Sequence, residues 1–221
     1  MSNSSNTIAI VDYGMGNLGS VANACSFLKL PAKIITSPDE LDDVAGVILP
    51  GQGAFGDCMG NLAAAGFVDP LKDWMAADKP LLGICIGLQV LFEGSAESPG
   101  TKGLGVLPGV LDKFVPHPDR KVPQMGWNSM QQKANLQGKP CPLWDGIDDD
   151  AYFYFVHSFY APLPPEATTA DTDWVSGTTT FGHEYTSAIW RGRLFATQFH
   201  PEKSQSAGKR LLKNFAATID G

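Results

Sequence analysis

This sequence of 221 residues contains little cysteine, no long apolar run and fewer basic than acidic residues. No stretch reaches the roughly 20 apolar residues that a membrane span requires. The polar start, MSNSSN, lacks the basic and apolar parts of a signal peptide. The four cysteines (Cys25, Cys58, Cys85 and Cys141) are far apart and form no C-x-x-C pair, so neither a disulfide framework nor a metal site is predicted. We therefore expect a cytoplasmic protein with a short disordered tail over residues 1–6.

The charge balance restricts the partners that the protein can bind. Sixteen Lys and Arg residues stand against 23 Asp and Glu residues, which gives a formal net charge of −7. A chain this acidic is not expected to bind nucleic acid or an anionic membrane surface. The apolar content of 43% is typical of a globular protein. The length predicts one domain, which we place over residues 7–221.

Short apolar runs alternate with helix-like segments through the first half of the chain. The strand-like runs are Thr7–Asp12, Ala32–Thr36, Val44–Leu49 and Leu81–Ile84, and the helix-like segments are Gly16–Leu30, Pro38–Asp43, Val68–Ala77 and Ile86–Glu93. This β-α rhythm predicts an α/β protein with a doubly wound, mostly parallel sheet of the flavodoxin-like type and helices on both faces.

The second half is rich in aromatic and β-branched residues and reads as strands. The strand-like segments are Val106–Phe114, Tyr152–Tyr160, Trp174–Thr180 and Ser187–Phe199. The last of them contains Arg191-Gly192-Arg193, which predicts a hairpin turn. We expect these strands to extend the sheet in antiparallel fashion. An amphipathic helix at about Ser206–Ile219 is predicted to end the chain.

The segment LLGICIGLQ, residues 81–89, places Cys85 between an apolar strand and a helix, with Gly83 and Gly87 two residues on either side. A nucleophile at such a tight turn has a strained backbone, and side chains at the flanking positions would collide with neighbouring main chain. The turn would also place the sulfur at a helix N-terminus, where the thiolate form is favoured. The alternative is a small buried cysteine of the core. The two framing glycines favour the nucleophile.

A thiol nucleophile needs a base, and the base needs a group that orients it. The sequence His200-Pro201-Glu202 supplies both after a strand-like run. If this segment is extended, side chains two residues apart share a face, so Glu202 can accept from one imidazole nitrogen while the other faces Cys85. The alternatives are a solvated loop histidine or a zinc ligand, and no second cluster supports the zinc site.

A third element is the glycine-rich turn Gly51-Gln52-Gly53, which follows the third predicted strand. Acyl transfer requires backbone N–H donors aimed at the developing oxyanion, and glycines expose such donors. Alone, the turn could be an ordinary loop. Its position at the carboxyl edge of the sheet, where open α/β proteins bind ligands, favours a shared site with Cys85.

Together, these residues resemble the class I (triad) glutamine amidotransferases. The resemblance implies a γ-glutamyl thioester on Cys85, with His200 as base and acid and Glu202 as its orienting partner. It also implies an oxyanion hole from the loop Gly51–Gly53 and the amide of Ile86. Gln89 matches the position that helps to hold glutamine in this family, and the backbone of Ser158 and Phe159 is implied to bind the α-carboxylate.

Further segments make the chain similar to the glutaminase subunits of imidazole glycerol phosphate synthases. They are Asp12–Leu18, Pro50–Phe55, Gly126–Asn128, His157–Phe159 and His200–Ser204. The family implies L-glutamine as substrate and a heterodimer with a (βα)8-barrel cyclase. The cyclase would use the ammonia to make imidazole glycerol phosphate and aminoimidazole carboxamide ribotide in histidine biosynthesis. No metal and no organic cofactor are implied.

Two positions depart from the usual pattern of this family, and four others are candidates for the partner interface. Gln52 stands where valine is commoner, and Ile86-Gly87-Leu88 replaces Leu-Gly-Met. The interface candidates are Asn17, Met125, Trp127 and Lys203. For Asn17 the alternative is a helix cap, for Met125 and Trp127 a buried core strand, and for Lys203 a solvated surface residue. His157 fits either a satisfied core histidine or a substrate contact.

Rival functions remain open from the residues alone. The nearest is the glutaminase of another pathway, although the Asp12–Leu18 segment argues against it. A cysteine peptidase or other hydrolase on the same fold would usually lack the His200-Pro201-Glu202 arrangement. A non-catalytic binding module would have no need for an intact Cys85, His200 and Glu202.

Overall fold

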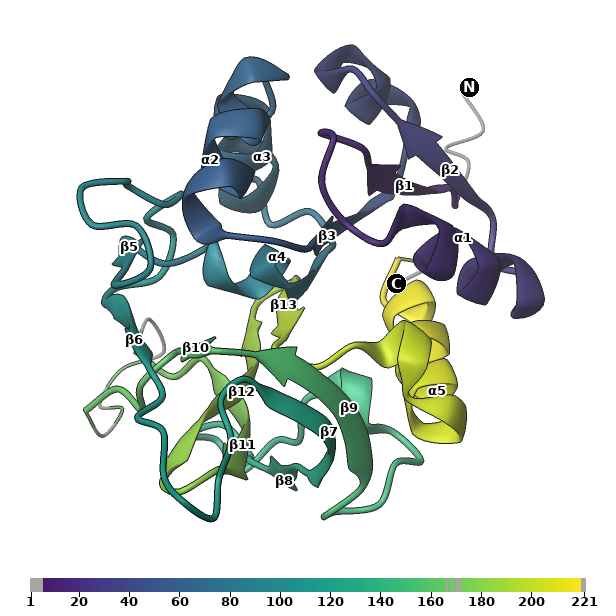
Figure 1. Cartoon of the computed structure of the whole chain (residues 1–221). Helices are drawn as coiled ribbons and strands as arrows, with labels where there is room; N and C mark the ends of the chain where they lie inside the picture. Colours follow the sequence, from purple (N-terminus) through teal and green to yellow (C-terminus); the bar gives the residue numbers. More distant parts are fainter. Residues whose placement is uncertain (1–5, 166, 168, 170–171, 220–221) are drawn as a thin grey trace.

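The computed structural model describes residues 6–165, 167, 169 and 172–219, and Figure 1 traces the chain. The disordered tail expected over residues 1–6 lies, apart from Asn6, outside the described residues. The first half follows the predicted rhythm closely. Its elements are β1 (Ile8–Val11), α1 (Leu18–Phe27), β2 (Ala32–Ile35), the 3-10 helix η1 (Pro38–Asp43), β3 (Gly46–Gly51), α2 (Phe55–Ala64), α3 (Val68–Ala76), β4 (Leu81–Cys85) and α4 (Ile86–Gln89).

The second half is mostly antiparallel. Its strands are β5 (Gly94–Ser95), β6 (Val110–Lys113), β7 (Gln124–Ser129), β8 (Gln131–Gln132), β9 (Tyr152–His157), β10 (Phe159–Tyr160), β11 (Val175–Thr180), β12 (Glu184–Arg191) and β13 (Leu194–Thr197). The helices are η2 (Pro142–Trp144), η3 (Pro201–Lys203) and α5 (Gln205–Ala217).

An eight-stranded sheet runs through the molecule in the order β2-β1-β3-β4-β13-β12-β11-β8. The pairs from β2 to β13 are parallel, and those from β13 to β8 are antiparallel. The predicted doubly wound sheet with an antiparallel extension is therefore confirmed. The hairpin turn predicted at Arg191–Arg193 is also confirmed, because Arg191 pairs with Leu194 across it.

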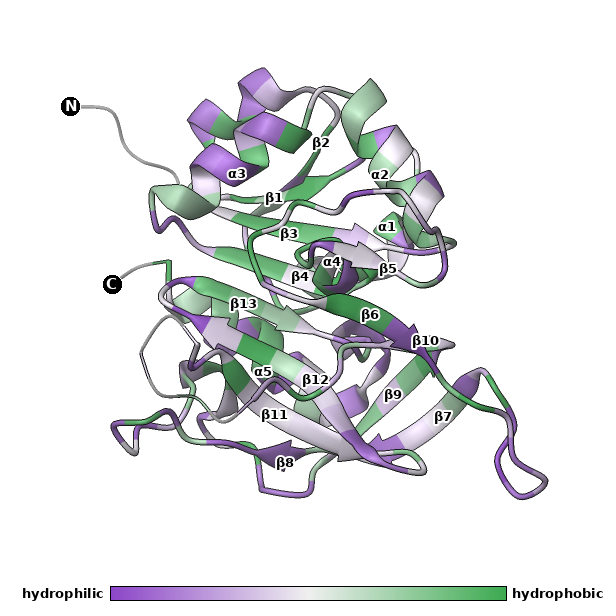
Figure 2. Cartoon of the chain, turned by 90° about the vertical axis from the view of Figure 1, so that its left-hand side faces the viewer, coloured by the Kyte–Doolittle hydropathy of each residue, from purple (hydrophilic) through white to green (hydrophobic). Residues whose placement is uncertain are grey.

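Helices cover both faces of the parallel part of the sheet. In Figure 1, α1 and α5 lie on one side of β1, β3 and β4, while α2, α3 and α4 lie on the other. The central strands are hydrophobic along their length, and the hydrophilic residues concentrate in loops and on the outer helix surfaces (Figure 2). Every residue of β1, β3 and β4 is buried, as expected for strands that are covered on both faces.

Two small sheets adjoin the large one: β10-β6-β5, and the antiparallel pair β7–β9. The predicted strand Tyr152–Tyr160 is divided at Ser158 into β9 and β10, which belong to different sheets. The predicted strand Val106–Phe114 is shorter, Val110–Lys113.

The helix after Cys85 is also shorter than predicted, since it ends at Gln89 and not at Glu93. The carbonyls of residues 90–93 accept hydrogen bonds from the backbone N–H groups of residues 103–107. These bonds replace those that would have continued the helix. The single turn that remains contributes only a weak helix dipole at the sulfur, because the dipole builds up from aligned peptide units.

Candidate active site

Cys85 forms a strained turn between β4 and α4. Its φ of 56° and ψ of −107° lie in a region that L residues rarely adopt, at a typical cost of about 1–3 kcal/mol. The flanking glycines make this turn possible. A Cβ on Gly83 would lie 2.5 Å from the carbonyl oxygen of Gly87, and one on Gly87 would overlap the carbonyl oxygen of Leu49. The elbow therefore depends on two positions without side chains.

His200 and Glu202 form a buried pair. His200 Nδ1 lies 2.9 Å from Glu202 Oε1, and the two side chains are 2% and 1% exposed. The expectation of an extended segment is wrong, because Pro201–Lys203 is a 3-10 turn that begins with proline at its first position. The turn brings the two side chains together all the same. Ser204 Oγ donates to the carbonyl of His200 and accepts from Tyr154 N, which ties the turn to β9.

The electrostatics of the site favour a charged imidazole. Burial alone would lower the pKa of His200, but interactions with the sulfur of Cys85 and with the carboxylate of Glu202 raise it to about 10. Within the part of the chain that the structure describes, the buried Nε2 of His200 makes no hydrogen bond. An anionic sulfur and an imidazolium are therefore mutually stabilising, and the ring nitrogen that is not held by Glu202 is available for proton transfer.

A cavity of about 280 Å³ opens over Cys85. Its lining includes most of the residues predicted to bind substrate, namely Gln52, Gly53, Ile86, Gln89, Ser158 and Phe159, together with Cys85 and His200. Gly51 lies just beneath, paired in register with Cys85 where β3 and β4 end side by side. Glu202 lies behind His200 and is not part of the lining. The structure thus gathers at one sheet edge residues that are up to 151 positions apart, from Gly51 to Glu202.

The loop after β3 is held by two side chains that sequence reasoning did not single out. Tyr13 donates to the carbonyl of Pro50 at 2.9 Å, and the thiol of Cys58 donates to the carbonyl of Gln52 at 3.4 Å. Both side chains are buried. Neither gives a local signal in the sequence, since each acts through a contact that only the packed fold creates.

Three further lining residues were also missed: Glu97, Pro123 and Val156. Glu97 accepts from the backbone N–H of Phe55 at 2.7 Å and brings a carboxylate to the rim. Gln198 does not line the cavity but lies against the sulfur, with its Nε2 3.7 Å from Cys85 Sγ. A signal for Gln198 was present, because it lies two residues before His200 at the end of a strand, where alternate side chains share a face.

His157 is buried, and both of its ring nitrogens have protein partners. Nδ1 lies 2.8 Å from the carbonyl oxygen of Phe159, and Nε2 lies 3.2 Å from the hydroxyl of Tyr185. Since a carbonyl only accepts, Nδ1 carries the proton. Burial, reinforced by the nearby charge of His200, lowers the pKa of His157 to about 4. This environment is that of a satisfied core histidine that also reaches the edge of the cavity.

This depressed pKa makes a prediction about acid stability. The unfolded chain, with a histidine pKa of about 6.5, binds more protons than the folded chain between pH 6.5 and 4. The free energy of unfolding should therefore fall as the pH is lowered through that window, by about 3 kcal/mol for His157 alone. We expect His157→Gln to lose less stability than the wild type between pH 7 and 4, measured by urea unfolding at each pH. Parallel curves for the two proteins would contradict the assignment.

The interface candidates lie largely at the surface. Met125 and Trp127 of β7 are 65% and 45% exposed, so the alternative of a buried Trp127 is wrong. Among the described residues this strand pairs only with β9, in a two-stranded ribbon whose outer face exposes Met125, Trp127 and Tyr152. Lys203 Nζ lies 5.8 Å over the ring of Tyr154 on that face. Asn17 precedes α1 at the cap position, but its side chain makes no capping hydrogen bond, so the capping alternative is wrong.

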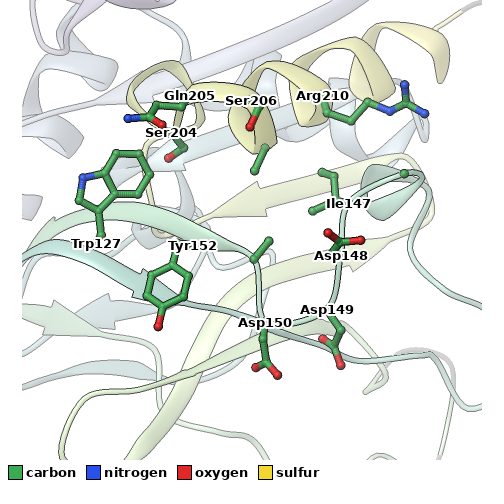
Figure 3. A pocket seen from close by; sticks show the side chains of 13 residues that line it. Trp127, Ile147, Asp148, Asp149, Asp150, Tyr152, Ser204, Gln205, Ser206 and Arg210 are labelled. Atoms are coloured by element: carbon green, nitrogen blue, oxygen red, sulfur yellow. The ribbon is translucent and has the colours of Figure 1, made fainter.

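A larger hollow of about 750 Å³ lies elsewhere, between the loop at residues 146–151 and the start of α5. Figure 3 shows Trp127 and Tyr152 at one end of it, Arg210 of α5 at the other, and Asp148–Asp150 below. The hollow is open to solvent and includes neither Cys85 nor His200. The smaller cavity, which contains Cys85 and His200, is therefore the candidate active site.

Over residues 6–165, 167, 169 and 172–219, no three His, Cys, Asp or Glu side chains are grouped so that they could hold a metal ion. Over the same residues, no helix is both long and apolar enough to cross a membrane.

Known proteins similar to this chain agree with the geometry. The family model for class-I glutamine amidotransferases matches residues 9–219. The imidazole glycerol phosphate synthase subunit HisH of Desulfitobacterium hafniense is 44% identical over 96% of this chain and 95% of its own length. The same subunit of Dehalococcoides mccartyi is 46% identical over 94% and 95%.

Solved structures support the fold. PurLQS from Thermotoga maritima matches 96% of this chain and 98% of its own with a TM-score of 0.71 and 18% identity. A crystal structure of a glutamine amidotransferase matches 96% and 99% with a TM-score of 0.70 and 17% identity. The chain belongs to the class-I glutamine amidotransferase family, among the HisH subunits.

Proposed function

We propose that this chain is the glutaminase subunit of an imidazole glycerol phosphate synthase. It hydrolyses L-glutamine at Cys85 and supplies the ammonia to a (βα)8-barrel cyclase, with which it forms a heterodimer. The cyclase uses the ammonia to form imidazole glycerol phosphate and aminoimidazole carboxamide ribotide in histidine biosynthesis. The similarity to HisH subunits over nearly the whole chain supports this pathway.

One observation supports the proposed hydrolysis of glutamine. Cys85, a nucleophile with a strained backbone, shares a cavity of about 280 Å³ with His200. The Nδ1 atom of His200 lies 2.9 Å from Oε1 of the buried Glu202 side chain. These are the three parts that thiol-dependent acyl transfer needs: a nucleophile, a proton carrier and a group that orients the carrier.

The reaction follows from this arrangement in two steps. The sulfur of Cys85 attacks the side-chain carboxamide carbon of glutamine, and the carbonyl oxygen takes up negative charge. We assign the stabilisation of that oxygen to backbone N–H groups of the Gly51–Gly53 loop and of Ile86, because Gln52, Gly53 and Ile86 line the cavity. His200 then donates its proton to the departing nitrogen, so that ammonia leaves and a γ-glutamyl thioester remains. A water molecule gives a proton to His200, attacks the thioester and releases glutamate.

The cavity also has groups suited to the amino-acid end of glutamine. We assign the α-carboxylate to the backbone of Ser158 and Phe159, where the chain leaves β9. Glu97 at the rim offers a negative charge for the α-ammonium group. Gln89 contributes its amide, whose Oε1 is buried and, among the described residues, has no hydrogen-bond partner. A substrate N–H is a suitable donor to that oxygen.

The partner surface is assigned to the outer face of β7 and β9, next to the active site. Met125, Trp127, Tyr152 and Tyr154 contribute exposed or half-buried apolar surface there, and the rings of Trp127 and Tyr154 lie edge to face at 6.2 Å. Exposed aromatic and methionine side chains of this kind are enriched in protein interfaces. Val156, on the same strand, lines the cavity, which connects this face to the site of ammonia release.

Asn17 and Lys203 complete the proposed interface, because α1 and η3 pack against each other beside this face.

We place the reaction in the cytoplasm, with residues 7–221 acting as one amidotransferase domain. The four cysteines are all free thiols in the structure, which suits a reducing compartment.

The test is steady-state glutamine hydrolysis by the purified chain, alone and with a histidine-pathway cyclase and its nucleotide ligand. We expect hydrolysis to be strongly stimulated by the cyclase and to disappear in Cys85→Ala. Hydrolysis that requires Cys85 but ignores the cyclase would assign the chain to another pathway. Absence of Cys85-dependent hydrolysis under every condition would overturn the proposal.

A further inference from the structure

Two buried glutamines connect the substrate-binding backbone to the sulfur of Cys85. Gln89 and Gln198 are 1% and 0% exposed and come from α4 and the end of β13. Gln89 Nε2 lies 3.1 Å from the carbonyl oxygen of Phe159 and 3.1 Å from Gln198 Oε1. Gln198 Nε2 in turn lies 3.7 Å from Cys85 Sγ.

The direction of this chain of hydrogen bonds is fixed at one end. An amide side chain has a donor end and an acceptor end, and its partners decide which way it points. The carbonyl of Phe159 can only accept, so Gln89 must turn its NH₂ group toward it. The same NH₂ group faces Gln198, which must therefore present its oxygen. The NH₂ group of Gln198 is then left for Cys85.

The acceptor that sets this direction is itself held in place. The carbonyl of Phe159 also accepts a hydrogen bond from His157 Nδ1 at 2.8 Å, and His157 is fixed at its other nitrogen by Tyr185. Two donors on one carbonyl oxygen define its position. A backbone carbonyl at the substrate site thus determines which atom of Gln198 meets the nucleophile.

The sulfur also has a main-chain neighbour, the carbonyl group of Val156. The thiol of Cys85 donates toward the carbonyl of Val156 at 3.9 Å, a contact that only the protonated sulfur can make. A donated N–H from Gln198 strengthens when the sulfur is anionic, because hydrogen bonds to charged acceptors are the stronger kind. Between these two neighbours, Gln198 favours the thiolate and Val156 the thiol.

We propose that Gln198 is a positioning residue for Cys85, which holds the thiolate by an N–H···S hydrogen bond whose polarity is set through Gln89 by the carbonyl of Phe159. This role builds on the proposed glutaminase function but concerns a residue that does not itself line the substrate cavity. It acts on the reactive state of the sulfur before glutamine is bound.

The first measurement is the rate at which iodoacetamide alkylates Cys85 as a function of pH, on the full chain without glutamine or cyclase. The second is kcat and KM for glutamine in the presence of the cyclase. Gln198→Leu removes the donor, and Gln198→Glu keeps the size and the acceptor for Gln89 but places negative charge beside the sulfur. Ser187→Ala is the matched control, since Ser187 is equally buried on the neighbouring strand and, among the described residues, its side chain bonds only to Thr179.

For Gln198→Leu we expect alkylation at pH 7 to slow by about tenfold or more, the effect of losing a hydrogen bond to a charged group. The rate should approach the wild-type value at high pH, and kcat should fall while KM changes little. Gln198→Glu should show a larger shift of the pH profile in the same direction, and Ser187→Ala none. A purely structural defect would instead slow alkylation equally at every pH.

Alkylation profiles of both Gln198 variants that coincide with the wild type would overturn the proposal, as would an equal loss of rate at every pH. Gln198→Glu preserves side-chain volume, so it still gives an answer if Gln198→Leu fails to fold, as judged by circular dichroism. Alkylation does not depend on glutamine turnover. A chain that shows the shifted profiles but never hydrolyses glutamine would disprove the glutaminase function alone.

Discussion

Replacing His200 by alanine is expected to reduce kcat for glutamine hydrolysis about 10⁴-fold or more, the range seen when the proton carrier of a catalytic triad is removed. The sulfur of Cys85 and the carboxylate of Glu202 together raise the pKa of His200 to about 10, which keeps its imidazole protonated. Without it, the sulfur loses its counter-charge and the departing nitrogen loses its proton donor. The measurement is initial-rate hydrolysis at saturating glutamine in the presence of the cyclase.

Glu202→Gln is the matched comparison for this prediction. Glutamine keeps the size of the side chain and can still contact Nδ1, but it removes the buried charge that stabilises the imidazolium. We expect kcat to fall less than in His200→Ala. The pKa of His200 should fall when residue 202 is neutral, so activity should be lost at a lower pH on the alkaline side of the pH profile. More than a tenth of wild-type activity in His200→Ala would contradict the assigned role.

The sequence predicted the parts of this site whose signals are local. Gly83, Cys85 and Gly87 form a pattern that has one mechanical explanation, and the structure shows the collisions that side chains at the glycines would cause. The alternation of buried strands and amphipathic helices likewise predicted the parallel sheet, because each element carries its own apolar face. Such features depend on neighbours within a few residues.

The sequence could not predict features that depend on contacts between distant segments. The helix after Cys85 stops at Gln89 because the segment at residues 103–107 bonds to the carbonyls of residues 90–93. The glycines and prolines of residues 99–109 predict a loop there, but not that the loop bonds to this part of the chain. The sequence did not predict where helix α2 begins and ends. The backbone N–H of Phe55, the first residue of α2, donates to the carboxylate of Glu97, which is 42 residues away. The sequence left Trp127 open between a core strand and a partner surface; in the described structure its strand pairs with β9 alone and Trp127 is 45% exposed.

The same distinction explains which site residues were missed. Gln198, Tyr13 and Cys58 act on Cys85 or on the Gly51–Gly53 loop through single polar contacts across the packed core. No local pattern marks Tyr13 or Cys58. For Gln198 the alternation with His200 indicates a shared face, but only the coordinates show its contact with Cys85. His200 and Glu202 could be found because two chemically suitable side chains lie two residues apart.

Gly87→Ala is expected to destabilise the fold by at least about 3 kcal/mol, at the upper end of what overpacking usually costs. A Cβ at this position would overlap the carbonyl oxygen of Leu49. That oxygen belongs to β3, whose register with β4 is fixed by the pairing of Leu49 with Gly83, so it cannot rotate away as a side chain would. Relief requires the first turn of α4 to move off the sheet, and that movement also displaces Cys85. Equilibrium urea unfolding measures the loss.

Gly60→Ala is the control that separates this collision from a general effect of glycine replacement. Gly60 lies within α2, and a Cβ there would have no atom within 4 Å. Alanine should therefore stabilise the protein by about 0.5–1 kcal/mol through helix propensity alone. Opposite signs for the two substitutions are expected, together with loss of glutaminase activity in Gly87→Ala and none in Gly60→Ala. If Gly87→Ala unfolds within about 0.5 kcal/mol of the wild type, the range of an ordinary surface substitution, the elbow does not depend on that contact.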